Sequence, residues 1–422
     1  MSNCILLARS AFIYLLLSIV SMDVALADTD MIKLNGFATL GAIYNDSDDL
    51  GFHTNLKTPA RSGFSFAPDS LIGGQANIHF APQWDAVVQA VYRDKQDSSL
   101  LNYIDVAFLR YTLDSRWEIR AGRMNTDIYF LSEYRSVGYA YLWARPPAEF
   151  YSKVTSVSQF EGADIMYKHS VGHGFLQLKA GFGESDARIA TTGRAYDIDF
   201  TDVLSTSISY QQDNWQLRAS FLDTEISDFS ASLKSIDDAI ALFPPSIWPG
   251  GLELRDRFDF VGKKQQFYGL GYQYDNDLWL IQSEVGFINS EWDLERDAVS
   301  GYISVGYQLE DLTYFATLSA VEPTKNNLSD SVGEISAGAP VAVVAAIQSF
   351  SPLIRDALEQ NVIKQHTLSF GAKWMLTPSL VAKFQLDYSA IAENGHALWR
   401  VYNEPNARET VTVTSLNLNW VF

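Results

Sequence analysis

The sequence predicts an all-β protein, a transmembrane antiparallel β-barrel of about 16 strands. Three observations predict this fold. Apolar and polar residues alternate over segments of about ten residues, tight turns alternate with long polar connections, and aromatic residues lie beside the tight turns. Because hydrocarbon offers no partner to a backbone N–H or C=O, a sheet that spans a membrane must close on itself. A soluble β-sandwich is the alternative, since its strands also alternate.

Each expected strand has two unlike faces. At the end of the chain, Leu416 and Leu418 share one parity, whereas Asn417 and Asn419 share the other. Successive side chains of a strand point to opposite faces, so we expect one face to meet lipid and the other to meet water. The segments with this pattern are 33–44, 70–80, 84–93, 103–113, 117–123, 159–169, 175–183, 200–211, 215–223, 265–274, 279–289, 298–307, 312–320, 365–375, 380–389 and 410–422.

The connections predict that the short turns lie at one end of the barrel and the long loops at the other. Short turns such as 81–83 and 212–214 join one set of neighbours, and long polar segments join the other set. Trp84, Trp117 and Trp215 each follow a short turn. Aromatic rings favour the membrane–water interface, so these residues are expected to form one aromatic girdle of the barrel.

The N-terminus has the features of a secretory signal peptide over residues 1–27. Arg9 precedes the apolar run from Ala11 to Val20, which is followed by an A-x-A site at Ala25–Ala27. The apolar run is too short to span a bilayer as a helix, although a membrane anchor is the alternative. The only cysteine, Cys4, lies in this leader. We expect residues 28–422 to form a single barrel domain without disulfides.

Several stretches resemble Gram-negative general porins. They are the first strand from Lys33 to Tyr44 (KLNGFATLGAIY), the segment from Arg116 to Arg123 (RWEIRAGR) with a long loop after it, and the final NWVF. The resemblance implies an outer-membrane location with short periplasmic turns and long extracellular loops. It also implies a homotrimer in outer-membrane lipid and lipopolysaccharide, and a water-filled channel for small hydrophilic solutes. In that family the terminal aromatic, here Phe422, is recognised by the barrel-assembly machinery.

The loop after the fifth strand, residues 124–158, corresponds to the inward-folded constriction loop of porins. The resemblance implies an arginine ladder on the facing wall, Arg93, Arg110 and Arg120, opposed by loop acids Glu133 and Glu149. This loop departs from the pattern because it also holds Arg135 and Arg145, and it could instead lie over the mouth or on a neighbouring subunit. The full set of expected constriction residues is His79, Arg93, Arg110, Arg120, Arg123, Glu133, Arg135, Arg145 and Glu149.

The net charge of −19 disfavours nucleic acid as a partner and predicts an acidic mouth with weak cation selectivity. A substrate-selective channel for sugars, carboxylates or other anions is the alternative, with loop aromatics and arginines holding the solute. A surface adhesin whose long loops carry the function is a third hypothesis.

No catalytic motif is visible, so we expect no enzyme, no cofactor and no metal site. The pair His169 and His173 has helical ligand spacing but straddles an expected turn, and the acidic segment 45–49 lacks the glycine and glutamate of an EF-hand loop. Two long loops contain apolar segments with helical periodicity, 232–245 and 339–363. They could cap the vestibule, line the pore or pack between subunits.

Overall fold

The computed structural model describes residues 31–422 except 55, 96–99, 153–154, 192–193, 230–233, 293–294, 325–331, 360–361 and 404–407. The predicted signal peptide, residues 1–27, lies outside the described residues, and Cys4 with it. No helix in the described part is both long and apolar enough to cross a membrane.

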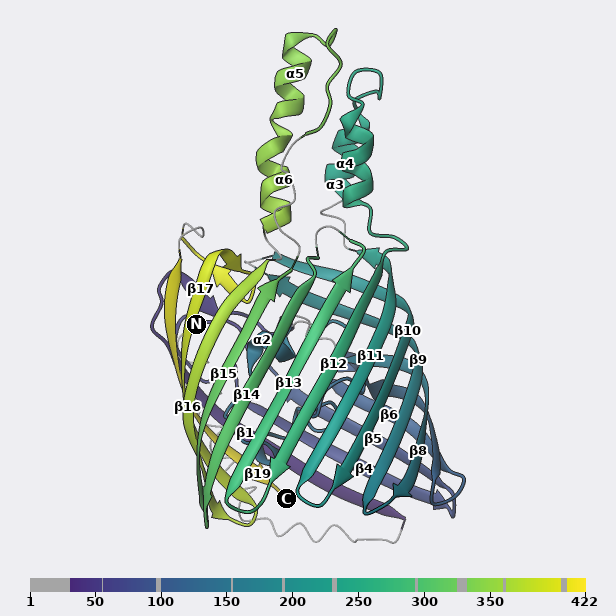
Figure 1. Cartoon of the computed structure of the whole chain (residues 1–422), viewed down its shortest axis with the longest axis vertical. Helices are drawn as coiled ribbons and strands as arrows, with labels where there is room; N and C mark the ends of the chain where they lie inside the picture. Colours follow the sequence, from purple (N-terminus) through teal and green to yellow (C-terminus); the bar gives the residue numbers. More distant parts are fainter. Residues whose placement is uncertain are drawn as a thin grey trace.

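Sixteen long antiparallel strands form one closed barrel, as the alternation predicts (Figure 1). They are β1 (Ile32–Asn45), β4 (Leu71–Ala81), β5 (Trp84–Arg93), β6 (Ile104–Thr112), β7 (Trp117–Asn125), β8 (Gln159–Val171), β9 (Gly174–Thr191), β10 (Arg194–Gln212), β11 (Trp215–Phe229), β12 (Lys264–Asp275), β13 (Trp279–Ser290), β14 (Ala298–Leu309), β15 (Leu312–Pro323), β16 (Ile363–Thr377), β17 (Leu380–His396) and β19 (Glu409–Val421). The short elements are β2 (Leu50–Phe52), β3 (Gly63–Ser65), β18 (Trp399–Val401), the 3-10 helices η1 (Leu100–Tyr103) and η2 (Gly138–Ala140), and the helices α2 (Ala148–Tyr151), α3 (Lys234–Ala241), α4 (Gly250–Phe258), α5 (Val341–Gln348) and α6 (Phe350–Glu359).

Two strands extend well beyond the expected segments. β9 continues to Thr191 and β10 begins at Arg194, so the pair stays hydrogen-bonded far past the rim. In this extension the outward positions are polar, as at Asp186 and Arg188. Above the membrane the outer face needs no apolar side chains, so the alternation that marks a spanning strand fades there.

The barrel closes between the first strand and the last. β1 pairs with β4 on one side and with β19 on the other. At the end of this seam, Phe422 donates its N–H to the carbonyl of Gly36 at 2.9 Å and accepts the Gly36 N–H at 2.7 Å. A Cβ on Gly36 would lie 2.1 Å from the Phe422 ring, so the ring occupies the space that the glycine leaves.

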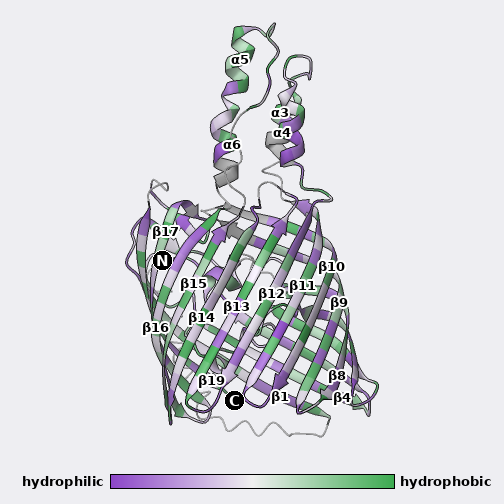
Figure 2. Cartoon of the chain, in the orientation of Figure 1, coloured by the Kyte–Doolittle hydropathy of each residue, from purple (hydrophilic) through white to green (hydrophobic). Residues whose placement is uncertain are grey.

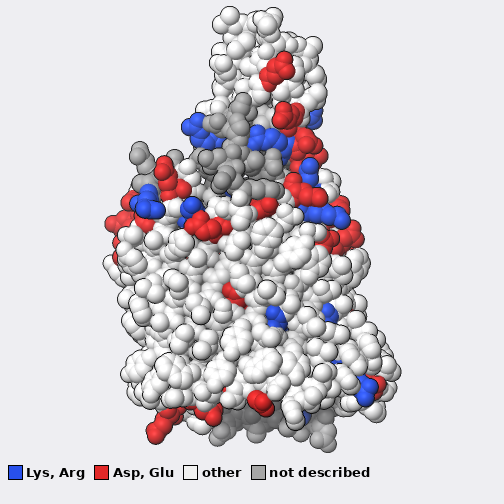
Figure 3. Space-filling view, viewed as in Figure 1, with Lys and Arg blue, Asp and Glu red and all other residues white. Residues whose placement is uncertain are grey.

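The two faces of the wall differ as expected. Leu416 and Leu418 are exposed on the outside, whereas Asn417 and Asn419 are buried on the inside. Figure 2 shows hydrophobic and hydrophilic residues alternating along the strands, and Figure 3 shows that most charged residues of this face lie near the two ends of the barrel. The band between them carries few charged residues and has the character of a lipid-facing surface.

The apolar segments at 232–245 and 339–363 form a helical tower rather than a lid or a pore lining. The helices α3 to α6 stand beyond the rim of the barrel, on the side opposite the short turns (Figure 1). Trp248 packs against Phe350 and Phe243 with ring centroids 5.5 and 5.6 Å apart, which joins the two loops. The buried tower residues, such as Ile240, Trp248 and Ile354, belong to the same apolar cluster as the inward loop.

Candidate functional site

The long loop between β7 and β8 folds into the barrel and touches inward-facing residues of many strands. Phe130 donates its backbone N–H to Glu284 of β13 at 2.9 Å, and the Trp143 indole donates to Ser304 and Thr317 of β14 and β15. Buried residues of the loop continue into the largest apolar cluster of the chain, for example Ile128 and Phe150. Aromatic packing therefore holds the loop inside the wall.

On the β7–β9 side the loop is held by ion pairs between side chains. The Arg120 guanidinium donates to Asp164 at 2.6 Å and to Glu133 of the loop at 3.2 Å, and Lys179 donates to Glu133 at 2.7 Å. Burial raises the pKa of Glu133, but Lys179 and Arg120 outweigh it and hold that pKa below its ordinary value. The two cations, Arg120 and Lys179, balance the two carboxylates of Glu133 and Asp164. Arg120 and Glu133 are therefore in contact, as expected, but the group has little net charge.

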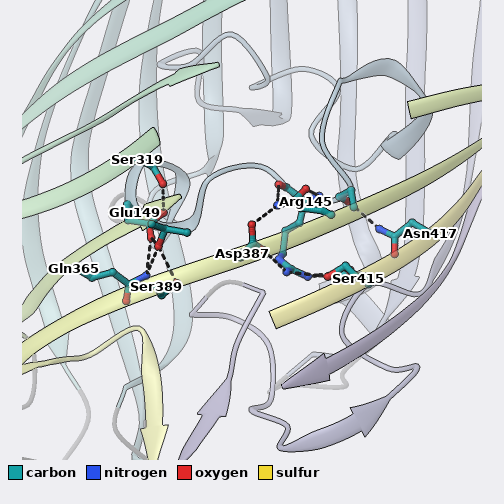
Figure 4. Close-up of polar contacts among 12 residues, drawn as sticks. Arg145, Glu149, Ser319, Gln365, Asp387, Ser389, Ser415 and Asn417 are labelled. Atoms are coloured by element: carbon teal, nitrogen blue, oxygen red, sulfur yellow. Dashed lines mark hydrogen bonds and ion pairs between the residues drawn. The ribbon is translucent and has the colours of Figure 1, made fainter. Parts of the chain in front are cut away.

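On the opposite side, Arg145 and Glu149 anchor the returning arm of the loop to β15–β19 (Figure 4). Arg145 donates to Asp69 at 3.0 Å and to Asp387 at 3.0 Å, and its guanidinium lies 4.3 Å from the centroid of the Phe52 ring. Both carboxylates and the arginine are largely buried. Arg145 is therefore a structural tie among the loop, the segment before β4 and the wall.

Glu149 does not face the arginine wall, contrary to the expectation from sequence. Its carboxylate accepts hydrogen bonds from Ser319 at 2.8 Å, from Gln365 at 2.6 Å and from Thr367. These residues lie on β15 and β16, across the lumen from β5–β7. The physical reason is that the loop crosses the whole lumen, so its second acid meets the far wall.

The expected arginine ladder is divided into two groups. Arg110 and Arg120 are direct cross-strand partners on β6 and β7, but each is paired with a wall acid, Asp85 and Asp164 respectively. His79 also bonds Asp85, at 2.8 Å, beside a short turn. The wall acids that neutralise these bases were not singled out from the sequence, although both lie on the polar parity of their strands.

Arg123 lies apart from both groups. It lies on the same strand as Arg120 but three residues further on, so it has the opposite parity. Its guanidinium forms an ion pair with Glu161 and donates to the carbonyls of Leu101 and Ile104. Glu161 is more than half exposed, so the pair lies at an open rim. Arg123 has no contact with the inward loop among the described residues.

Arg93 and Arg135 border a cavity between the loop and β5–β6, which we call the inner cavity. It has a volume of about 90 Å³. Arg93 donates to Asp105 and to Ser136 of the loop, both at 2.5 Å. In the described part Arg135 has no carboxylate within ion-pair distance, and its guanidinium lies 5.8 Å from the centroid of the Tyr151 ring. Arg135 borders the inner cavity and also a smaller cavity beside Asp69 and Arg145.

Two lysines that the sequence did not single out complete the inner cavity. Lys95, just after β5, lies 3.5 Å from Asp105, and Lys57 donates to Ser158 at 3.3 Å. Burial, with Lys95 and Arg135 close by, lowers the pKa of Lys57 to about 7. Among the described residues that line the inner cavity, these four cationic groups lie near two acids, Asp105 and Glu133, and Glu133 is already paired with Arg120 and Lys179.

A second, larger cavity opens outward from the first. This outer cavity has a volume of about 280 Å³ and shares Lys57, Lys95 and Gln159 with the inner cavity. Its other side is lined by Glu184, Asp186 and neighbouring rim residues of β8–β10. The charge along the two cavities therefore changes from mixed at the rim to basic beside the loop.

The chain matches known porins in sequence and in fold. Residues 46–227 match a family described as phosphate-selective porin O and P, which includes the strands and the loop that form the cavities. Over residues 46–227 the chain is therefore similar to that porin family. A search of curated proteins finds no match to the sequence.

Solved porin structures share the fold over nearly the whole chain. Salmonella typhi OmpF, in a complex with daunomycin, has a TM-score of 0.52 at 11% identity, covering 93% of this porin and 97% of OmpF. OmpT of Vibrio cholerae has a TM-score of 0.50 at 7% identity, covering 93% and 99%. An anion-selective porin from Comamonas acidovorans has a TM-score of 0.50 at 10% identity, also covering 93% and 99%. At these identities the similarity concerns the fold of the porin.

Proposed function

We propose that this porin is a passive channel that favours small hydrophilic anions, with no enzymatic step, and that residues 124–158 form its constriction. The observation that carries the proposal is the inner cavity, where Lys57, Arg93, Lys95 and Arg135 lie around one acid, Asp105, which is paired with Arg93 and Lys95. Positive charge in a narrow, low-dielectric passage concentrates anions. The matching family is described as phosphate-selective and one structural neighbour as anion-selective, which supports a preference for anions.

The acidic surface supports the opposite preference and remains the second candidate. The net charge of −19 would attract cations to the mouth. We give more weight to the inner cavity, because surface charges act through solvent and are screened over roughly 8 Å at physiological salt. Charges that border a constriction are screened much less.

The reversal potential across a planar bilayer in a potassium chloride gradient tests this proposal. We expect the wild-type porin to show an anion-favouring potential, and Arg135→Glu to shift it strongly toward cations. Arg116→Glu is the matched control, since it makes the same charge change in the short turn before β7, where it lines neither cavity, and should shift the potential far less. A wild-type potential that favours cations would overturn the proposal in favour of the acidic mouth.

We further propose that the porin works as a homotrimer embedded in outer-membrane lipid and lipopolysaccharide. One neighbour, OmpT of Vibrio cholerae, is described in a trimer form, which supports this assembly. We also propose that Phe422 is the signal read by the barrel-assembly machinery, since its side chain lies exposed at the end of the closing strand. Replacing Phe422 with alanine should lower the yield of assembled barrel in the outer membrane.

A further inference from the structure

Lys383 lies on the inner face of β17, at a position that the porin function described above does not explain. It is the direct cross-strand partner of Lys373 on β16, so two lysines stand side by side on the same face. Lys383 is nearly fully buried, whereas Lys373 is partly exposed. Among the described residues, no carboxylate lies within ion-pair distance of the Lys383 ammonium.

The Lys383 ammonium is instead enclosed by the inward loop. It donates to the carbonyl oxygens of Gly138, Tyr141 and Trp143 at 2.5, 2.6 and 2.7 Å. An ammonium has three donors, so these bonds use all of them. The ring of Tyr141 lies over the same group, with its centroid 4.3 Å from Nζ. Residues 138–143, which we call the loop tip, therefore wrap around one side chain of the wall.

Two further contacts press the loop tip against the same part of the wall. Asn417 of β19 donates to the carbonyl of Ala144 at 2.9 Å. A Cβ on Gly138 would lie 2.1 Å from the side-chain oxygen of Asn419 and 3.0 Å from that of Thr39. Only glycine leaves room for this approach, and the approach brings the Gly138 carbonyl to Lys383.

Charge accounts for the strength of this contact. A buried ammonium without a counter-ion is costly unless polar groups replace its water. The loop carbonyls are the groups that do so, and bonds from an ionised donor are stronger than bonds between neutral groups. Lifting the loop tip would leave Lys383 without partners, so the charge opposes any movement of the tip.

We propose that Lys383 is the positioning residue of the constriction: it fixes the loop tip, and through the tip it holds Arg135 and Ser136 at the inner cavity. Arg135 lies three residues before Gly138, and Ser136 is bonded to Arg93 of β5. The proposal rests on the loop being the constriction, but it does not depend on which ions the porin favours.

Single-channel recording of the purified porin in planar bilayers tests the role of Lys383. We expect Lys383→Met to lose the steady open level and to fluctuate among several conductances. Lys373→Met is the matched control, since it removes the same charge from the neighbouring strand and only one bond to the loop, from Nζ to the Tyr139 carbonyl at 3.1 Å. It should keep a steady level, and Lys383→Arg, which can still donate to the carbonyls, should restore one.

The outcomes separate this proposal from the proposed function. A Lys383→Met channel as steady as the Lys373→Met channel would overturn the positioning role, whatever the ion preference of the wild type. If Lys383→Met does not fold, Gly138→Ala gives the answer, because its methyl group pushes the tip off the wall and leaves the lysine in place. A steady Gly138→Ala channel with wild-type conductance would also overturn the proposal.

Discussion

The two sides of the lumen are built differently. Along β13–β19 and β1 the interior is filled by the inward loop and by the small sheet of β2 and β18, which packs in a buried cluster that includes Leu50, Trp399 and Val411. Along β5–β9 the lining is charged, and the larger cavities lie there, whereas the cavities that border the other side measure about 30 and 70 Å³. The loop is attached to both walls, by apolar contacts and Arg145 on one side and by the ion pairs of Glu133 on the other, and the larger cavities lie beside the second attachment.

The loop has buried anchors on both sides, Lys383 and Arg145 on the filled side and Arg120 and Lys179 on the open side. On the open side Arg135 also borders the inner cavity. We expect the buried anchors to fix the position of the loop, and the charges that border the cavities to set the electrostatic potential there. The following experiments test whether the two tasks are separated in this way.

Loss of a buried anchor on the filled side should have the largest effect. Arg145→Met leaves Asp69 and Asp387 without their cation, and breaking a buried ion pair in this way costs about 3–5 kcal/mol. Urea unfolding of the detergent-solubilised porin measures the loss. Arg123→Met on the open side breaks a more exposed pair with Glu161 and should cost about 0–1 kcal/mol. Equal losses would contradict the comparison.

A smaller effect is expected when the pH is changed, and it concerns the ion preference of the channel rather than its stability. The pKa of Lys57 is lowered to about 7, so its positive charge is present below that pH and is lost above it. Lys95, Arg135, Asp105 and Asp186 are the charged groups around it. We expect the anion preference, measured as the reversal potential, to fall between pH 6 and pH 8. In Lys57→Met this change should disappear, and a wild-type potential constant over that range would rule out the switch.

The smallest effect should come from the helical tower. Its helices stand outside the barrel and pack on one another, and none of the four lines either cavity among the described residues. Replacing residues 234–258 and 341–359 with short Gly/Ser linkers should leave single-channel conductance and reversal potential unchanged. A marked change in conductance would show that the tower reaches the passage.

The barrel could be predicted from sequence because each spanning strand obeys a local rule. Alternation along Trp84–Arg93 or Leu380–Ser389 depends only on lipid outside and water inside. The rule fails where its cause is absent, as in the extension of β9 to Thr191 beyond the rim. It also fails for the pairing of β2 with β18, which joins segments about 350 residues apart and has no local pattern.

The site was less predictable, because it depends on which charges cancel. Arg110 and Arg120 were expected as a free ladder, but their neutralisation by Asp85 and Asp164 follows from cross-strand register, which one strand does not reveal. Glu149 was assigned to the wrong wall because the course of the loop is a tertiary property. Lys383 had one visible signal, a lysine at an inward position of a spanning strand that requires a polar partner.

The seam described at Gly36 has a consequence for biogenesis. The edge of β1 that faces β19 stays unpaired until the final residues have arrived, since Phe422 supplies the last two hydrogen bonds of the join. A polypeptide interrupted during export would expose that edge along its whole length and would have no means to seal it. Closure of the barrel is thereby coupled to the arrival of β19.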